Sequence, residues 1–203
     1  MAKAAQRSAE AGTGYFQLKW DAEAISPSLA SVEVRNPNKV PAWGGFYWQY
    51  FSPIEDIDTA KDTPLQIERK LYTRTHTPGG EELQPVQGPL AVGDKVVVRL
   101  VVRTDRDMEF VHLKDLRPAG LEPTQVLSGY RYQGGLAYYQ STSDLATHFF
   151  FDYLPRGRYV LEYDLRVFHA GDFSGGMASL QCMYAPKFTG HSAGERLQGV
   201  ARE

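Results

Sequence analysis

The residues best suited to chemistry are histidines and one cysteine, and their spacing forms no local site. The chain has five histidines, which follow one another at intervals of 21 to 36 residues: His76, His112, His148, His169 and His191. Local zinc sites usually place two ligands two to five residues apart, and no pair has that spacing. The sequence therefore predicts no metal site.

Cys182 is a candidate nucleophile, with His148 or His169 as the base that takes its proton. It lies in the run Ser179-Leu-Gln-Cys-Met-Tyr184, which is typical of a strand, where a free cysteine is usually a small buried apolar residue. The acidic pairs at 81–82 and 105/107 and the nearby Asp115 are candidates for a glycosidase dyad, although carboxylates in turns usually face water. No Gly-x-Ser-x-Gly or Walker motif occurs. We predict no catalytic residue, no cofactor and no enzyme activity.

Aromatic residues offer a second kind of site. The chain has 12 Tyr, 10 Phe and 3 Trp, and aromatic rings can stack on sugar rings. Segment 43–50 is rich in them, and we expect its rings to fill a core. Four tyrosines in and after a glycine-flanked run, 129–135, are candidates for exposed aromatic contacts: Tyr130, Tyr132, Tyr138 and Tyr139. The alternative function that they support is a freestanding carbohydrate-binding β-sandwich.

Length and charge limit the function further. The 203 residues make one large domain or two small ones. A net charge of −2 argues against nucleic-acid binding, which normally needs a basic surplus. No apolar run approaches the roughly 20 residues of a membrane span, and the polar first ten residues do not resemble a signal peptide.

The elements that must position these residues are mostly strands. Alternating or β-branched segments predict strands, separated by turns, at 15–20, 31–36, 42–51, 65–71, 95–103, 110–114, 138–139, 149–151, 158–168 and 177–184. Segment 42–51 is aromatic on both faces, which predicts a strand buried on both sides. Residues 2–11 favour a short helix by propensity, and the acidic, proline-bracketed segment 52–64 predicts a linker. The pattern favours an antiparallel sandwich or barrel.

Four segments carry a family resemblance: 43–51, 112–123, 127–130 and 181–186. The most specific is the central Lys-Asp-x-x-Pro-Ala-Gly-x-Glu-Pro pattern, which is followed by Ser-Gly-Tyr. In this order they resemble the C-terminal end of bacterial alpha-2-macroglobulin-like proteins, especially the long Bacteroidetes type. The resemblance runs from about Gly12 to Val200.

The resemblance implies a fold and a domain organisation. Residues 1–13 would be the helical tail of a preceding domain, 14–51 strands of a CUB-like domain, 52–64 a linker, and 65–203 the terminal macroglobulin-type, immunoglobulin-like antiparallel β-sandwich. The function implied is a non-catalytic interaction module of an endopeptidase inhibitor that traps proteases. Its partners would be the other domains of a longer, exported protein in the periplasm or at the cell surface and, through that protein, target proteases.

The resemblance also implies two contact residues. In thioester-bearing relatives the terminal domain packs against the thioester, and the matching positions here are Met183 and Tyr184. A thioether beside a phenol would help to keep water away from a thioester. The alternative is that both residues pack in the core of their own domain. The Cys-x-Glu-Gln thioester motif does not occur in this sequence, whose lone cysteine lies in Cys182-Met-Tyr-Ala185.

Overall fold

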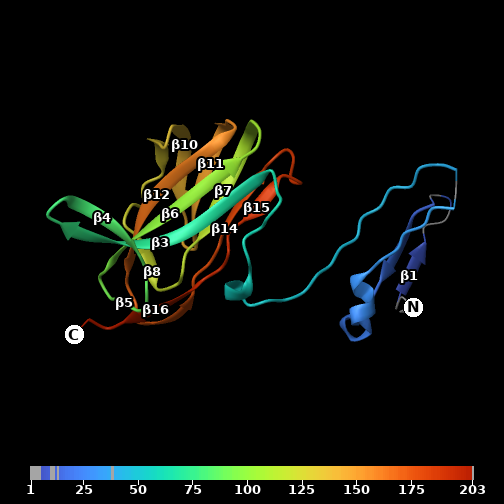
Figure 1. Cartoon of the computed structure of the whole chain (residues 1–203), viewed down its shortest axis with the longest axis horizontal. Helices are drawn as coiled ribbons and strands as arrows, with labels where there is room; N and C mark the ends of the chain where they lie inside the picture. The colour runs from blue at the N-terminus through green and yellow to red at the C-terminus, as the bar shows by residue number, and fades with distance from the viewer. Residues whose placement is uncertain (1–5, 10–11, 13, 38, 203) are drawn as a thin grey trace. The chain divides into compact units, whose positions relative to one another are not determined.

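The computed structural model describes residues 6–9, 12, 14–37 and 39–202. The chain divides into two compact units, Met1–Gln49 and Tyr50–Glu203 (Figure 1). The second unit contains every strand predicted beyond residue 64.

The first unit begins with a strand pair. Strands β1 (Gln6–Ala9) and β2 (Phe16–Lys19) are antiparallel, and two short 3₁₀ helices follow, η1 (Ala22–Ala24) and η2 (Pro27–Ala30). The helix predicted over residues 2–11 is therefore wrong at residues 6–9, and its other residues lie outside the described part of the chain. So short a helix is marginal in water, whereas pairing with β2 satisfies the backbone hydrogen-bonding groups.

The aromatic segment 42–51 is not a buried strand. Its described residues pair with no other strand, and six aromatic side chains are at least half exposed: Trp43, Phe46, Tyr47, Trp48, Tyr50 and Phe51. The strand predicted at 31–36 is likewise absent. A strand forms only where a neighbour accepts and donates its backbone hydrogen bonds, and the described residues supply none here.

The second unit is built from two main sheets. The six-stranded sheet has the order β15-β14-β7-β11-β10-β9, and the five-stranded sheet has the order β4-β3-β6-β12-β8. Except for a parallel β5–β16 pair in a small third sheet, β13-β16-β5, all pairs in this unit are antiparallel. The predicted mostly-β, antiparallel sandwich is confirmed.

The observed strands of this unit overlap every segment predicted as a strand beyond residue 64. The five-stranded sheet consists of β3 (Leu65–Thr77), β4 (Gly80–Pro85), β6 (Lys95–Thr104), β8 (Leu121–Pro123) and β12 (Gly157–Val167). The six-stranded sheet consists of β7 (Met108–Leu116), β9 (Gly129–Gln133), β10 (Leu136–Thr142), β11 (Ala146–Leu154), β14 (Ala178–Cys182) and β15 (Thr189–His191). The small sheet consists of β5 (Leu90–Ala91), β13 (Gly171–Ser174) and β16 (Arg196–Val200).

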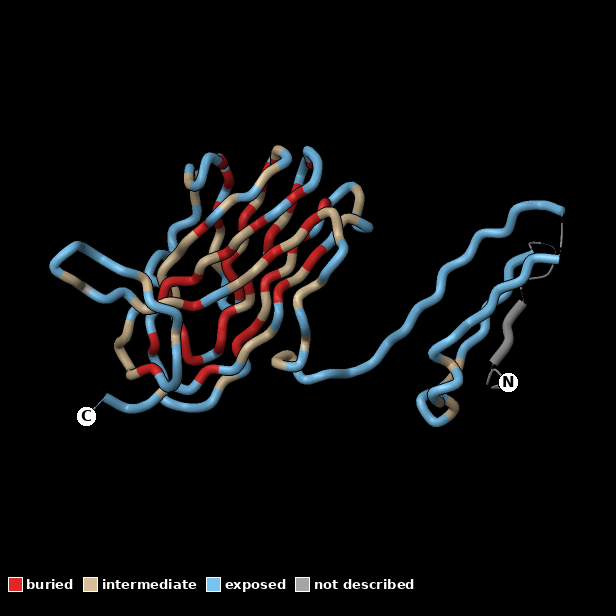
Figure 2. The backbone as a smooth tube through the Cα atoms, viewed as in Figure 1, coloured by how far each residue is buried: buried red, intermediate tan, exposed pale blue. Residues whose placement is uncertain are grey.

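The core lies between the two main sheets, and buried residues alternate with more exposed ones along their strands (Figure 2). In β6, Val96, Val98, Leu100 and Val102 are all fully buried, as the period of two in a strand requires. The opposite sheet contributes the largest buried rings, including Phe149.

A buried ion pair joins the two sheets within this core. Arg69 of β3 donates from Nε to Oδ1 of Asp115 of β7 at 2.7 Å, and the two side chains are 1% and 0% exposed. Tyr163 of β12 donates its hydroxyl to the other Asp115 oxygen at 2.5 Å, and Glu195 also pairs with Arg69. Burial, and then the Asp115 charge, raises the pKa of Tyr163 well above its ordinary value, so the phenol remains a donor.

The segment predicted as a linker makes regular contacts with the sandwich. It contains η3 (Ile54–Asp56), and Ala60 then donates its N–H to the His191 carbonyl at 2.9 Å. Gly194 donates to the Ile57 carbonyl at 3.0 Å. Residues 57–60 thus run beside the chain that follows β15.

Candidate functional site

An exposed apolar cluster of the second unit lies at the end of β14. Met183 and Tyr184 directly follow that strand and are 58% and 81% exposed, while Phe110 of β7 is 44% exposed. The Tyr184 ring meets the Phe110 ring edge-on at a centroid distance of 5.1 Å. We call these three residues the Phe110 patch.

Backbone geometry holds the Phe110 patch outward. Phe110 has φ +51°, which is uncommon for a bulky residue inside a strand, and its carbonyl accepts the Met183 N–H at 2.9 Å. A tight turn follows, in which Ala185 donates to the Cys182 carbonyl and Phe188 donates to the Ala185 carbonyl. Met183 and Tyr184 are thus displayed on this turn and do not pack in the core.

The surroundings of Cys182 give it a structural role. It is buried, and its thiol donates to the Glu109 carbonyl at a sulfur–oxygen distance of 3.2 Å. Its strand partner on β7 is Val111, whereas His148 pairs with Lys114, three residues further along the strand. That offset is about 10 Å, too far for proton transfer from the thiol to His148.

The fold brings together two histidines that are 36 residues apart in the sequence. Nε2 of His112 and Nδ1 of His148 lie 2.9 Å apart, and the His112 ring stacks on Phe150 at 4.6 Å. Burial is the main cause that lowers the pKa of both histidines, so the pair is neutral at pH 7. Sequence reasoning missed this pair because only the register of β7 and β11 creates it. No group of three or more His, Cys, Asp or Glu side chains suited to a metal occurs among the described residues.

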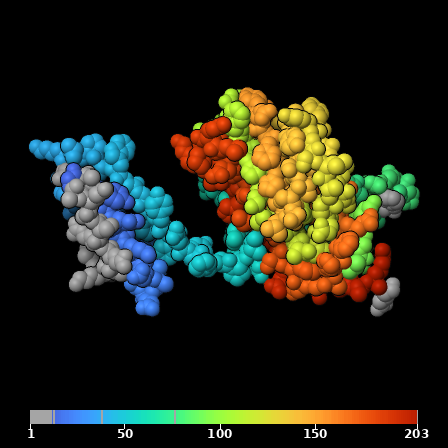
Figure 3. Space-filling model, turned by 180° about the vertical axis from the view of Figure 1, so that it is seen from behind, coloured from blue at the N-terminus to red at the C-terminus, as the bar shows by residue number. Residues whose placement is uncertain are grey.

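The four candidate tyrosines separate onto two faces of the β9–β10 hairpin. Tyr130 and Tyr132 are 77% and 78% exposed, and the Tyr139 ring meets the Tyr130 ring edge-on at 5.2 Å. Tyr138 differs from the expectation, since it is buried. Neighbouring residues of a strand point to opposite faces, so Tyr138 faces the other sheet while Tyr139 faces solvent. Figure 3 shows the molecule from the side of the six-stranded sheet, with β9–β11 in yellow to orange.

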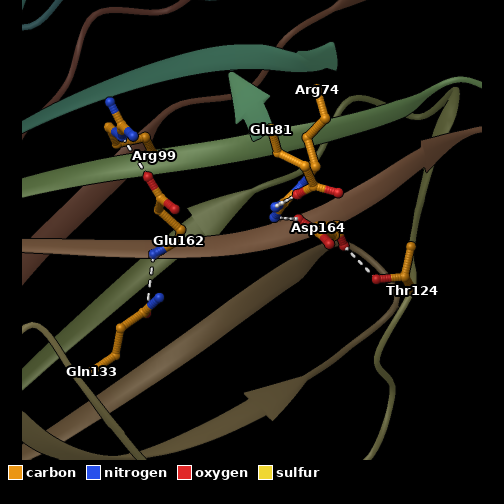
Figure 4. A network of polar contacts seen from close by, with 7 residues as sticks. All are labelled: Arg74, Glu81, Arg99, Thr124, Gln133, Glu162 and Asp164. Carbon is orange, nitrogen blue, oxygen red and sulfur yellow. Dashed lines mark hydrogen bonds and ion pairs between the residues drawn. The ribbon is translucent and has the colours of Figure 1, made fainter. Parts of the chain in front are cut away.

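Beneath Tyr138, a cavity of about 340 Å³ lies between the β9–β10 hairpin and β12. A polar network joins several of its lining residues to Arg99, which lies outside the lining (Figure 4). Arg74 donates to Asp164 at 2.9 Å, Arg99 donates to Glu162 at 2.5 Å, and the Gln133 side chain accepts the Glu162 N–H at 3.0 Å. The arrangement can bind a polar molecule, but it holds no nucleophile beside a base.

In the part of the chain that the structure describes, no helix has the length and apolar character needed to cross a membrane.

Comparison with known proteins identifies the sandwich. Residues 65–187, more than half of the chain, match the family described as "Bacterial Alpha-2-macroglobulin MG10 domain". A search of curated proteins finds no match.

Solved structures share the fold. A point mutant of Salmonella alpha-2-macroglobulin has 24% identity and a TM-score of 0.56, covering 71% of this chain and 10% of that one. Native Escherichia coli alpha-2-macroglobulin, from domain MG7 to the C-terminus, has 21% identity and a TM-score of 0.54, covering 70% of this chain and 24% of that one. The chain thus matches only a small part of these proteins. With its sandwich matched over 65–187, the chain belongs to the bacterial alpha-2-macroglobulin family.

Proposed function

We propose that this chain acts as the C-terminal interaction module of an alpha-2-macroglobulin-like endopeptidase inhibitor, without catalysing a reaction itself. In this proposal residues 65–203 are the terminal macroglobulin domain, 52–64 connect to it, and 14–51 are CUB-like strands that find their partners in a longer protein. That protein would be exported to the cell envelope and would meet target proteases. The family membership and the coverage of only 10–24% of the similar structures support this reading.

The observation that carries the proposal is the Phe110 patch. Two rings and a thioether are between 44% and 81% exposed on a strained backbone and a tight turn, and none of the three belongs to the second unit's hydrophobic core. An exposed apolar cluster of this kind is typical of an interface. We infer that Met183 and Tyr184 dock onto a neighbouring domain and, where that domain carries a thioester, shield it from water.

The first test is an immunoblot of fractionated source cells with an antibody against residues 65–203. A band several times heavier than 22.7 kDa in the envelope fraction is the expected result. A band at the chain's own mass in the cytoplasm would contradict the proposal, because the chain would then not be part of a longer, exported inhibitor.

The docking itself is tested by amide hydrogen exchange on the heavier protein. We expect slower exchange at residues 182–188 there than in the 203-residue chain, and loss of the difference in Tyr184→Ser. Tyr130→Ser is the matched control, because Tyr130 is equally exposed and lies outside the Phe110 patch. Equal exchange in both proteins would contradict the docking.

A further inference from the structure

The two histidines that the fold brings together lie on the outer face of the six-stranded sheet. Along β7, Val111 and Leu113 are buried in the core, so His112 between them points to the opposite face. His148 on β11 precedes the buried Phe149 and faces the same way. Both histidines are partly exposed, so an ion in solution can reach them.

The separation of the two ring nitrogens suits a single metal ion. Nε2 of His112 lies 2.9 Å from Nδ1 of His148. Metal–imidazole bonds are about 2.0–2.1 Å long, so two nitrogens bound to one ion at a right angle lie about 2.9 Å apart, whereas a tetrahedral angle needs about 3.3 Å. Right angles are typical of the square-planar and tetragonal sites of Cu²⁺ and Ni²⁺. The spacing therefore favours Cu²⁺, which binds nitrogen ligands more tightly than Ni²⁺ or Zn²⁺.

A neighbouring hydroxyl fixes which nitrogen of His148 can bind a metal. The Ser143 hydroxyl donates to the Ala146 carbonyl at 3.2 Å, so its oxygen accepts the N–H at Nε2 of His148, 3.3 Å away. The lone pair of His148 is then on Nδ1, the nitrogen that faces His112. Histidines that bind metals normally donate their other N–H in this way.

His112 is also prepared for binding. Its ring stacks on the Phe150 ring at a centroid distance of 4.6 Å. Burial lowers the pKa of both histidines, so neither carries an extra proton at pH 7 that a metal would have to displace. Without a metal, Nε2 of His112 donates its proton to Nδ1 of His148. When an ion takes the place of that proton, the proton moves to Nδ1 of His112, and rotations of the two rings direct both lone pairs at the ion.

The positive charges near the pair oppose a cation only weakly. Lys114, two residues further along β7, is exposed, so water and salt screen its charge. The Arg117 guanidinium donates to the carbonyls of Ser143 and Asp144 at 2.5 and 2.6 Å, and the negative ends of these two dipoles partly offset its charge.

We propose that Nε2 of His112 and Nδ1 of His148 bind one Cu²⁺ ion, with water molecules at its remaining positions. Spacing along the sequence did not predict this site, because its two ligands are 36 residues apart. The site needs no other domain, so it does not depend on the proposed docking of the Phe110 patch.

The first test follows the ¹⁵N-labelled 203-residue chain by NMR while CuCl₂ is added. Cu²⁺ is paramagnetic and broadens the signals of nuclei close to it. Below one equivalent, we expect the backbone amide signals of residues 111–113 and 147–149 to disappear before those around the other three histidines. EPR of the same sample should show two nitrogens bound to Cu²⁺. This test uses the unaltered chain, so it does not depend on the folding of a variant.

Calorimetric titration with CuCl₂ then compares variants. His112→Gln and His148→Gln each remove one of the two ligands and should weaken Cu²⁺ binding by roughly 100-fold or more, since loss of even an outer hydrogen-bond partner costs about 10–100-fold. His169→Gln and His191→Gln are the controls and should leave binding unchanged, because both residues lie outside the pair. The proposal is overturned if Cu²⁺ first broadens signals around another histidine, if EPR shows a single bound nitrogen, or if a control weakens binding as much as His112→Gln does.

Discussion

At the scale of single residues, the backbone of Phe110 separates a structural role from a functional one. A residue with a Cβ at φ +51° is strained by about 1–2 kcal/mol relative to glycine. In an ordinary strand, glycine is instead less stable than alanine by roughly 0.5–1 kcal/mol. The sign of this difference therefore reports the strain directly.

We expect Phe110→Gly to be more stable than Phe110→Ala by about 1 kcal/mol, because both lose the Tyr184 contact and only glycine relieves the strain. Urea unfolding of the two variants measures the difference. The same pair of substitutions at the neighbouring Glu109, also exposed on β7, is the control and should show the ordinary order. If alanine is the better residue at both positions, the strained conformation of Phe110 is wrong.

Asp115 is the residue on which the cross-sheet network depends. Asp115→Ala leaves the Arg69 guanidinium buried without its main partner, and removing one member of a buried pair costs about 3–5 kcal/mol. Asp172→Ala breaks the ion pair with Arg196 in exposed surroundings and should cost much less, because water and salt screen an exposed pair. Chemical unfolding would compare them, and similar losses would mean that the network is not buried.

At the scale of elements, the sequence pattern predicts which segments form strands better than it predicts which strands pair with each other. The β-branched run of β6 and the alternation of β12 were sufficient to locate both strands. Segment 42–51 has an equally strong strand pattern, yet it stays exposed, because pairing depends on a partner that local residues do not encode. The face of the sheet on which Tyr138 lies likewise depends on the strand register. The cavity beneath it also depends on the second sheet.

The His112–His148 pair is a product of that register and predicts a pH dependence. Burial lowers the pKa of both histidines below the ordinary value of 6.5, with Lys114 opposing protonation of each and Arg117 that of His148. The folded state then binds fewer protons than the unfolded chain just below pH 6.5, so the free energy of unfolding falls as the pH drops through that value.

We expect thermal stability to be flat above about pH 7 and to decline towards pH 5. The double variant His112→Gln with His148→Gln should lose most of this decline, and His169→Gln, outside the pair, should keep it. Differential scanning calorimetry across this range measures both. An unchanged decline in the double variant would show that other groups cause it.

At the scale of the whole molecule, the boundary of the sandwich lies before the first strand of the matched family domain. Residues 57–60 run beside residues 191–194, joined by the two backbone bonds at Ala60 and Gly194 and by the Ala193 N–H, which donates to the Thr59 hydroxyl at 3.0 Å. A fragment of residues 52–203 keeps these bonds, whereas residues 65–203 lose all three. At about 1 kcal/mol for each net hydrogen bond, the 65–203 fragment should be less stable than 52–203 by roughly 3 kcal/mol. The 52–203 fragment should unfold at the midpoint of the main transition of the full chain. Equal midpoints for the two fragments would make residues 52–64 a plain linker; a lower midpoint for 65–203 alone would make them part of the domain that the sandwich needs in order to fold.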